Sequence, residues 1–235
     1  EDIKLFDVSK FICDEQFCYV GTSSESFYYD DDHLSKVGAN LFKSEISKLL
    51  LKSKNITKTK DQIIFYGSST IRLWTNLKKD FPNFNVQNFG FGGALISSLS
   101  KNFNLIFKNL NPKIFILYMG GNDLSKFNSS IEIVNQQLKF IKKISLFFPQ
   151  TKIINLSIKP SFERLNKISI IKKINQSMRE ESISNNKFNQ LDFFDKFFKN
   201  GKLSKKYFLQ DGLHLNDNGY QILQNAISNT LTKIN

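Results

Sequence analysis

From residue 61 to the end of the chain, short apolar runs alternate with longer amphipathic stretches. The apolar runs cover 62–66, 85–89, 113–119, 152–157 and 189–194. The amphipathic stretches lie near 70–80, 94–109, 129–147 and 165–184, with a last one over about 217–233. Runs this short and this apolar are typical of strands buried on both faces of a parallel sheet. The alternation predicts an α/β fold: a three-layer α/β/α sandwich with a five-stranded parallel sheet.

Residues 1–50 do not continue this series. They offer one strand-like run over 3–8 and one helix from about 36 to 51, too little to bury a core of their own. We expect residues 1–50 to be the partial C-terminal remnant of a preceding domain, residues 51–60 a linker, and residues 61–235 the main domain. The chain opens on Glu1 rather than Met, which indicates a processed product or a piece of a longer chain.

The charge and apolar content of the chain bear on whether it binds nucleic acid or a membrane. The 235 residues carry a net charge of +12, which would suit a polyanion or an anionic membrane surface. The Lys and Arg residues are spread over several predicted helices, and no known nucleic-acid module is present, so we expect no nucleic-acid partner. No apolar run approaches the ~20 residues of a transmembrane helix.

Cys13 and Cys18 are the only cysteines, and no histidine lies near them at metal-ligand spacing, which argues against a zinc site. Their spacing alone is equally compatible with a local disulfide and with two unrelated buried thiols.

The two histidines of the chain stand in the same short motif. His33 follows Asp30 by three residues, and His214 follows Asp211 by three residues. An aspartate on a turn before a helix can orient an imidazole as a general base. The second motif precedes the last predicted helix, at the carboxyl edge of the sheet, where functional sites of such sheets lie.

Three further polar motifs follow predicted strands. Ser69 lies in a strand-to-helix turn, where its hydroxyl can act as a nucleophile, although an ordinary N-cap serine is an alternative. The G-x-S-x-G elbow of α/β-hydrolases is absent, because position 71 is Ile. Gly93 closes a glycine-rich turn whose spacing and position do not fit a dinucleotide fingerprint, which favours an N–H donor to an oxyanion. Asn122 can supply a second donor, with an Asx turn as the alternative.

Together these residues supply a nucleophile, a base, its orienting carboxylate and oxyanion donors on successive strand ends, which is the set that acyl transfer needs. The stretches that carry them are FYGSSTIRLW (65–74), NFGFGGALI (88–96), LYMGGNDL (117–124), SIKPSFER (157–164) and DGLHLNDNGY (211–220). In these blocks the chain resembles the SGNH (GDSL-type) hydrolase family, whose fold is flavodoxin-like.

The resemblance implies roles for individual residues. Ser69 would be the nucleophile, His214 the general base and Asp211 its orienter. The oxyanion hole would consist of the backbone N–H groups of Ser69 and Gly93 and the side-chain amide of Asn122. The family's usual Asp before the nucleophile is Ser68 in this chain.

The front of the chain is similar to another branch of the same family. FICDEQFCYV (11–20) and YYDDDHLSKVGANL (28–41) resemble the end of the SGNH domain that is fused to membrane acyltransferases of cell-surface polysaccharides. That resemblance implies a Cys13–Cys18 disulfide, an extracytoplasmic location and a membrane tether upstream of Glu1. Asp30 and His33 would be an orienter and a base, but their serine, glycine and asparagine blocks are missing, so we do not expect them to function.

The sequence therefore predicts a serine esterase for a small acyl ester, with acetyl as the favoured group and a carbohydrate as a candidate alcohol portion. No metal or organic cofactor is implied. One alternative is an O-acyltransferase that passes the acyl group to a cell-surface polysaccharide. Another is a non-catalytic binding module that has kept the fold. Acyl length, the identity of the alcohol and the oligomeric state do not follow from the sequence.

Overall fold

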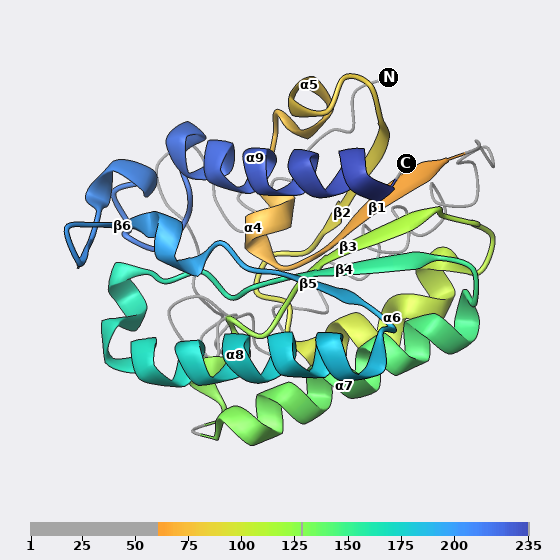
Figure 1. The fold of residues 1–235 in the computed structure, drawn as a ribbon, viewed down its shortest axis with the longest axis horizontal. Coiled ribbons are helices and arrows are strands. Elements are labelled where there is room, and N and C mark those ends of the chain that lie inside the picture. The colour runs from red at the N-terminus through yellow and green to blue at the C-terminus, as the bar shows by residue number, and fades with distance from the viewer. Residues whose placement is uncertain (1–60, 128, 235) are drawn as a thin grey trace, which may run out of the picture. The chain divides into compact units, whose positions relative to one another are not determined.

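The centre of the fold is a parallel sheet of five strands in the order β2-β1-β3-β4-β5 (Figure 1). A computed structural model describes residues 61–127 and 129–234. The strands are β1 (Gln62–Gly67), β2 (Asn85–Gly90), β3 (Ile114–Tyr118), β4 (Lys152–Leu156) and β5 (Asn189–Leu191). Every neighbouring pair in this sheet is parallel, which confirms the predicted architecture. The order reverses between β1 and β3, the place where flavodoxin-like sheets hold their ligands.

Helices cover both faces of the sheet (Figure 1). The helices are α4 (Ser69–Arg72), α5 (Leu77–Asp80), α6 (Ile96–Phe107), α7 (Ser130–Phe147), α8 (Ile168–Asn185) and α9 (Asp217–Ile234). Helices α4, α5 and α9 lie on one face, and α6, α7 and α8 lie on the other. Short 3-10 helices and a small hairpin fill the connections: η1 (Asp123–Ser125), η2 (Phe162–Lys167), η3 (Phe194–Phe197), η4 (Lys205–Tyr207), β6 (Phe198–Lys199) and β7 (Lys202–Leu203).

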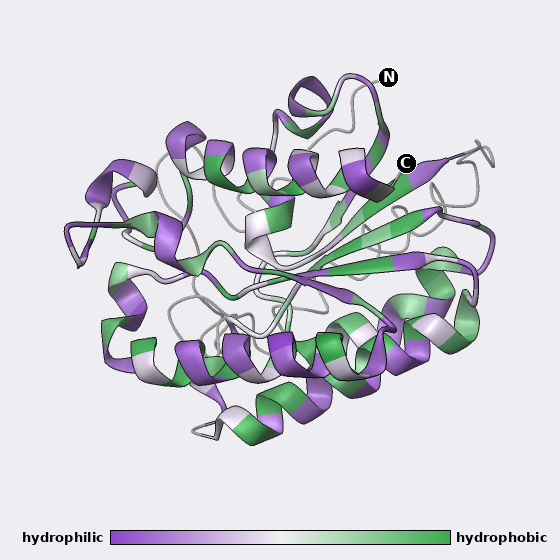
Figure 2. Ribbon diagram, viewed as in Figure 1, coloured by the Kyte–Doolittle hydropathy of each residue, from purple (hydrophilic) through white to green (hydrophobic). Residues whose placement is uncertain are grey.

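The central strands β1 and β3 are buried along their whole length because each face of the sheet carries a helical layer, whereas the edge strands β2 and β5 carry polar residues and are only partly buried (Figure 2). Successive residues of β1 contact the two helical layers. Ile63 and Phe65 belong to the core shared with α4, α5 and α9, whereas the ring of Tyr66 packs against aromatic rings of α6 and α7. The Tyr66 hydroxyl donates to the carbonyl oxygen of Leu99 at 2.8 Å, so this buried polar group is satisfied.

The amphipathic stretch near 70–80 forms two helices of four residues, so the prediction of one helix there is wrong. After Arg72 the spacing of the backbone hydrogen bonds shortens from four residues to three and then to two, and the helix ends. Leu73 N–H still reaches the carbonyl of Ser69, but Trp74 N–H bonds to Ile71 and Thr75 N–H bonds to Leu73. The indole of Trp74 is buried and donates to Asp80 Oδ2 at 2.6 Å. Burial of this large side chain outweighs the continuation of the helix.

The strand expected at 189–194 is shorter than predicted, because it ends at Leu191 and η3 follows. Phe193 and Phe194 are nonetheless buried, which explains their place in an apolar run. The predictions for residues 1–60, including the domain remnant, the linker, the Cys13–Cys18 pair and the Asp30–His33 motif, lie outside the described residues. Within the described part of the chain, no helix is both long and apolar enough to cross a membrane.

Candidate active site

Ser69 is the first residue of α4, directly beyond the end of β1. Hydrogen bonds to the neighbouring strands β3 and β2 fix the turn between β1 and α4. Ser68 N–H donates to the carbonyl oxygen of Tyr118 at the end of β3 (3.1 Å), and the Asn88 side chain of β2 donates to the Ile71 carbonyl oxygen (2.7 Å). Because α4 has only four residues, a long helix dipole is not available to activate the hydroxyl, and a neighbouring base has to do so.

That base lies within reach. Ser69 Oγ and His214 Nε2 are 3.1 Å apart, although 145 positions separate the two residues in the sequence. His214 Nδ1 and Asp211 Oδ2 are 2.6 Å apart. The side chain of His214 is 25% exposed and that of Asp211 is 45% exposed, so the chain of contacts opens to solvent at the carboxylate. The structure thus brings the three predicted residues into one hydrogen-bonded line.

The turn from Asp211 to His214 is tied down through its backbone. Gly212 adopts φ = +66°, a conformation that glycine takes without strain. Asp211 Oδ1 accepts hydrogen bonds from the N–H groups of Leu213 and His214, both at 2.9 Å. Partial burial raises the pKa of the Asp211 carboxyl, but the bonds from His214 and Leu213 outweigh burial and hold it below its usual value. Asp211 is therefore ionised at neutral pH and keeps Nδ1 as the donor atom of the imidazole.

The two backbone N–H groups predicted for the oxyanion hole, those of Ser69 and Gly93, make no hydrogen bond within the described part of the chain. Gly93 has φ = +66° in the turn between β2 and α6. Asn122, 8% exposed, follows β3, and its Nδ2 donates to the carbonyl oxygen of Ala94 at 3.2 Å. This bond places the amide beside the Gly93 turn, at the switch between β1 and β3.

Two neighbours fix the loop around Asn122. Arg164 Nη2 donates to Asn122 Oδ1 at 3.1 Å, which identifies Nδ2 as the amide atom left for donation. Asp123 is buried, and both its carboxylate oxygens accept from the N–H of Ile96, at 3.2 and 3.3 Å. Burial raises the pKa of Asp123 to about 6. The hydrogen bonds from Ile96 N–H show that Asp123 anchors the start of α6.

Sequence reasoning assigned no role to Lys159 and Arg164, although both lie in the quoted stretch SIKPSFER. Both follow β4 at the carboxyl edge of the sheet, so the rule that located Ser69 and Asn122 could have drawn attention to them. No group of three His, Cys, Asp or Glu side chains in the described part of the chain is placed to hold a metal ion.

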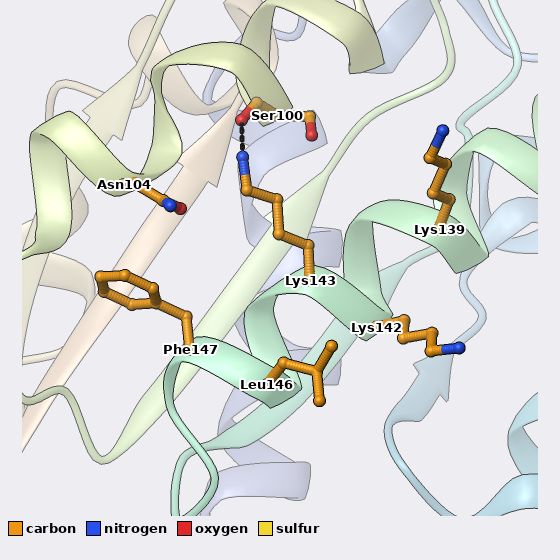
Figure 3. A pocket seen from close by; sticks show the side chains of 7 residues that line it. All are labelled: Ser100, Asn104, Lys139, Lys142, Lys143, Leu146 and Phe147. Atoms are coloured by element: carbon orange, nitrogen blue, oxygen red, sulfur yellow. Dashed lines mark hydrogen bonds between the residues drawn. The ribbon is translucent and has the colours of Figure 1, made fainter.

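A hollow of about 460 Å³ lies between α6 and α7 and shares no residue with this site (Figure 3). Its lining residues are Ser100, Asn104, Lys139, Lys142, Lys143, Leu146 and Phe147. Lys143 Nζ donates to the Ser100 carbonyl oxygen at 2.5 Å, while Lys139 and Lys142 point in other directions. The lysines therefore do not converge on one ligand position, and the hollow is no rival to the Ser69 site.

Two family models match ranges of the chain. The family model described as GDSL-like lipase/acylhydrolase matches residues 64–222. The model described as SGNH domain (fused to AT3 domains) matches residues 1–48. A curated relative, N-acylneuraminate cytidylyltransferase of Escherichia coli, is 32% identical over 175 residues. That match covers 71% of this chain, which spans only 39% of the relative's length.

Solved structures share the fold. A Streptococcus pneumonia protein assigned as a platelet activating factor has a TM-score of 0.69 at 25% identity, over 83% of this chain and 97% of that one. A GDSL-like lipase of Bacteroides thetaiotaomicron has a TM-score of 0.67 at 17% identity, over 80% and 98%. A family 3 carbohydrate esterase of Clostridium thermocellum has a TM-score of 0.56 at 18% identity, over 71% and 92%. The chain belongs to the GDSL-like lipase/acylhydrolase family.

Proposed function

We propose that this chain is a serine esterase that hydrolyses a small acyl ester through an acyl-enzyme on Ser69. The observation that carries the proposal is the hydrogen-bonded line from Ser69 Oγ to His214 Nε2 (3.1 Å) and from His214 Nδ1 to Asp211 Oδ2 (2.6 Å). A hydroxyl next to an oriented imidazole is the arrangement that activates serine for attack on a carbonyl carbon.

In the first half of the reaction, Ser69 Oγ attacks the ester carbonyl carbon while His214 Nε2 takes the hydroxyl proton. The carbonyl oxygen becomes an oxyanion and accepts hydrogen bonds from the N–H groups of Ser69 and Gly93 and from Asn122 Nδ2. Asp211 stabilises the imidazolium. The C–O bond to the alcohol then breaks, and the alcohol leaves with the proton from His214.

In the second half, a water molecule attacks the acyl carbon of the Ser69 ester. His214 takes one proton from the water and returns it to Ser69 Oγ as the acyl–enzyme bond breaks. The carboxylic acid leaves, and the enzyme is restored. Every proton passes through His214, so no metal or organic cofactor takes part in the proposed steps.

For the substrate, we propose an acetyl group on a sugar hydroxyl. Two comparisons support a sugar: the 32% identical relative is named for an N-acylneuraminate, and a carbohydrate esterase has the same fold. Hydrolysis of O-acetylated N-acylneuraminate, compared with an O-acetylated neutral sugar, would identify the alcohol portion. Equal rates with both sugars and with p-nitrophenyl acetate would contradict sugar selectivity.

The test of the reaction is Ser69→Ala assayed on p-nitrophenyl acetate, with Ser68→Ala as the matched control. We expect Ser69→Ala to lose nearly all turnover and Ser68→Ala to keep most of it, since Ser68 lies one residue early and its N–H is already bonded to Tyr118. A Ser69→Ala enzyme that keeps most of the parental turnover would refute the proposal.

A second candidate is acyl transfer, in which a sugar hydroxyl replaces the water. The observation that favours it is the match of residues 1–48 to the SGNH domain fused to AT3 domains, which also supports an extracytoplasmic location. Product analysis with an added polysaccharide would separate the two reactions. Transfer predicts acylated polysaccharide at the expense of free acid, whereas hydrolysis predicts the same yield of free acid with and without the polysaccharide.

A further inference from the structure

Lys159 is a charged side chain inside the protein. It follows β4, and only 2% of its surface is exposed. A buried ammonium group is costly unless it is paired or hydrogen-bonded, and an apolar side chain of similar size would cost less. Its position at the carboxyl edge of the sheet therefore requires an explanation.

The groups that contact Lys159 Nζ come from a segment about 50 residues later in the sequence. Lys159 Nζ donates to the carbonyl oxygen of Leu213, 54 residues away, and lies 5.4 Å from the centre of the Phe208 ring. The backbone N–H of Lys159 donates to the Tyr118 hydroxyl at 3.4 Å. Burial, together with the charge of Arg164, lowers the pKa of Lys159 to about 7, and the charge of Asp211 opposes this.

Leu213 is the residue between Gly212 and His214, so the bonded carbonyl belongs to the turn that carries the proposed acid and base. The preceding carbonyl, of Gly212, accepts from Phe162 N–H at 2.9 Å, and the following one, of His214, accepts from Leu209 N–H at 2.8 Å. Three consecutive carbonyl groups of this turn are thus held, and Lys159 supplies the only side-chain donor and the only charge among the three bonds.

We propose that Lys159 is a positioning residue for the ester reaction: its buried Nζ holds the Leu213 carbonyl, so that His214 Nε2 faces Ser69 Oγ. This inference rests on the proposed function of Ser69 and His214. Both forms of Lys159 can donate to this carbonyl, and the protonated form, present at and below about pH 7, makes the stronger hydrogen bond. Displacement of a catalytic group by about 1 Å can reduce a rate ~100-fold, so loss of this bond acts on turnover.

The test is Lys159→Met, which removes the ammonium and keeps an unbranched stem of similar length. We expect kcat for p-nitrophenyl acetate to fall about 10- to 100-fold while KM stays within about twofold, because the acyl-binding groups are unchanged. Lys173→Met, at an exposed position of α8, is the matched control and should leave both constants unchanged. A Lys159→Met enzyme with kcat within twofold of the parent refutes the role.

A double-mutant cycle with His214→Ala separates positioning from a general structural effect. Without the imidazole there is nothing for Lys159 to position, so Lys159→Met should not lower the residual activity of His214→Ala further. An equal fold-loss in both backgrounds refutes the role. The failure modes are distinguishable: Ser69→Ala with full turnover refutes the proposed function, whereas loss in Ser69→Ala without loss in Lys159→Met refutes the positioning role alone.

The pH dependence of stability provides a measurement that does not need activity. The titratable groups facing Lys159 are Tyr118 from β3, Arg164 from η2 and Asp211 from the turn. Between about pH 7 and pH 10.5 the unfolded chain binds a proton on Lys159 that the folded chain lacks. The Tm of the parent minus that of Lys159→Met should therefore rise over this interval, and a constant difference would contradict burial of the Lys159 Nζ. If Lys159→Met does not fold, Lys159→Gln, which keeps a shorter donor, takes its place in each assay.

Discussion

Replacement of Asp211 by Asn changes one functional atom of the site and preserves its shape. Asp211 Oδ1 accepts from the N–H groups of Leu213 and His214, and the asparagine oxygen can keep both bonds. The new NH₂ group then takes the place of Oδ2, 2.6 Å from His214 Nδ1. Because NH₂ donates, Nδ1 has to accept, and the imidazole proton moves to Nε2. A protonated Nε2 cannot take the proton of Ser69.

The expected loss follows from the role that is removed. General-base catalysis contributes about 10²- to 10⁴-fold to a rate, so kcat should fall by that factor, or roughly 3 to 5 kcal/mol in activation free energy. Thermal stability should change little, because both backbone hydrogen bonds remain. Asp217→Asn, an exposed carboxylate in the first turn of α9, is the control.

The assay is kcat on p-nitrophenyl acetate together with Tm from thermal unfolding. An Asp211→Asn enzyme that keeps more than about a tenth of the parental kcat would refute the reasoning, since a tenfold loss lies below the range for a general base.

Three further changes test the oxyanion hole, the core and a buried carboxyl. Asn122→Ala should lower kcat about 10²- to 10³-fold with little change in KM, and an unchanged kcat would contradict an oxyanion role. Phe103→Ala empties a buried site among the rings of Tyr66 and Phe140, so unfolding should cost about 3 to 5 kcal/mol less and Tm should fall roughly 6 to 20 °C, whereas exposed Leu105→Ala should change Tm little. Burial raises the pKa of Asp123 to about 6, so the folded chain binds more protons than the unfolded chain between about pH 4 and pH 6. The Tm of the parent minus that of Asp123→Asn should therefore fall as pH rises through this interval, and a rise would contradict the burial of the carboxyl.

The central strands could be predicted because burial on both faces leaves a continuous apolar run in the sequence, whereas the partly exposed edge strands β2 and β5 could be predicted from their alternation with amphipathic stretches. Residues 62–66 are an example: all of them are buried in β1. The helix near 70–80 could not be predicted correctly, since its break depends on where the indole of Trp74 finds a core and a carboxylate partner. Such a partner is a property of the assembled fold rather than of the local pattern.

Some residues of the candidate site could likewise be predicted from the sequence, and others could not. Ser69, Asn122 and His214 follow predicted strands or precede a predicted helix, and the rule that strand ends meet at one edge was enough to group them. Lys159 and Arg164 also follow a predicted strand, but the sequence does not show what they contact, because their partners Leu213 and Asn122 are 54 and 42 residues away. A lysine in a polar loop is most often exposed, and only the packed structure shows that Lys159 is buried.

The most direct test of the central claim is covalent labelling of folded protein with a fluorophosphonate, followed by mass spectrometry of the peptides. We expect one modified residue, Ser69, with labelling retained in Ser68→Ala and strongly slowed in His214→Ala, because the imidazole 3.1 Å away activates the hydroxyl. Absence of a label on Ser69, or labelling that proceeds equally fast without His214, would contradict the role of Ser69 as a nucleophile activated by His214.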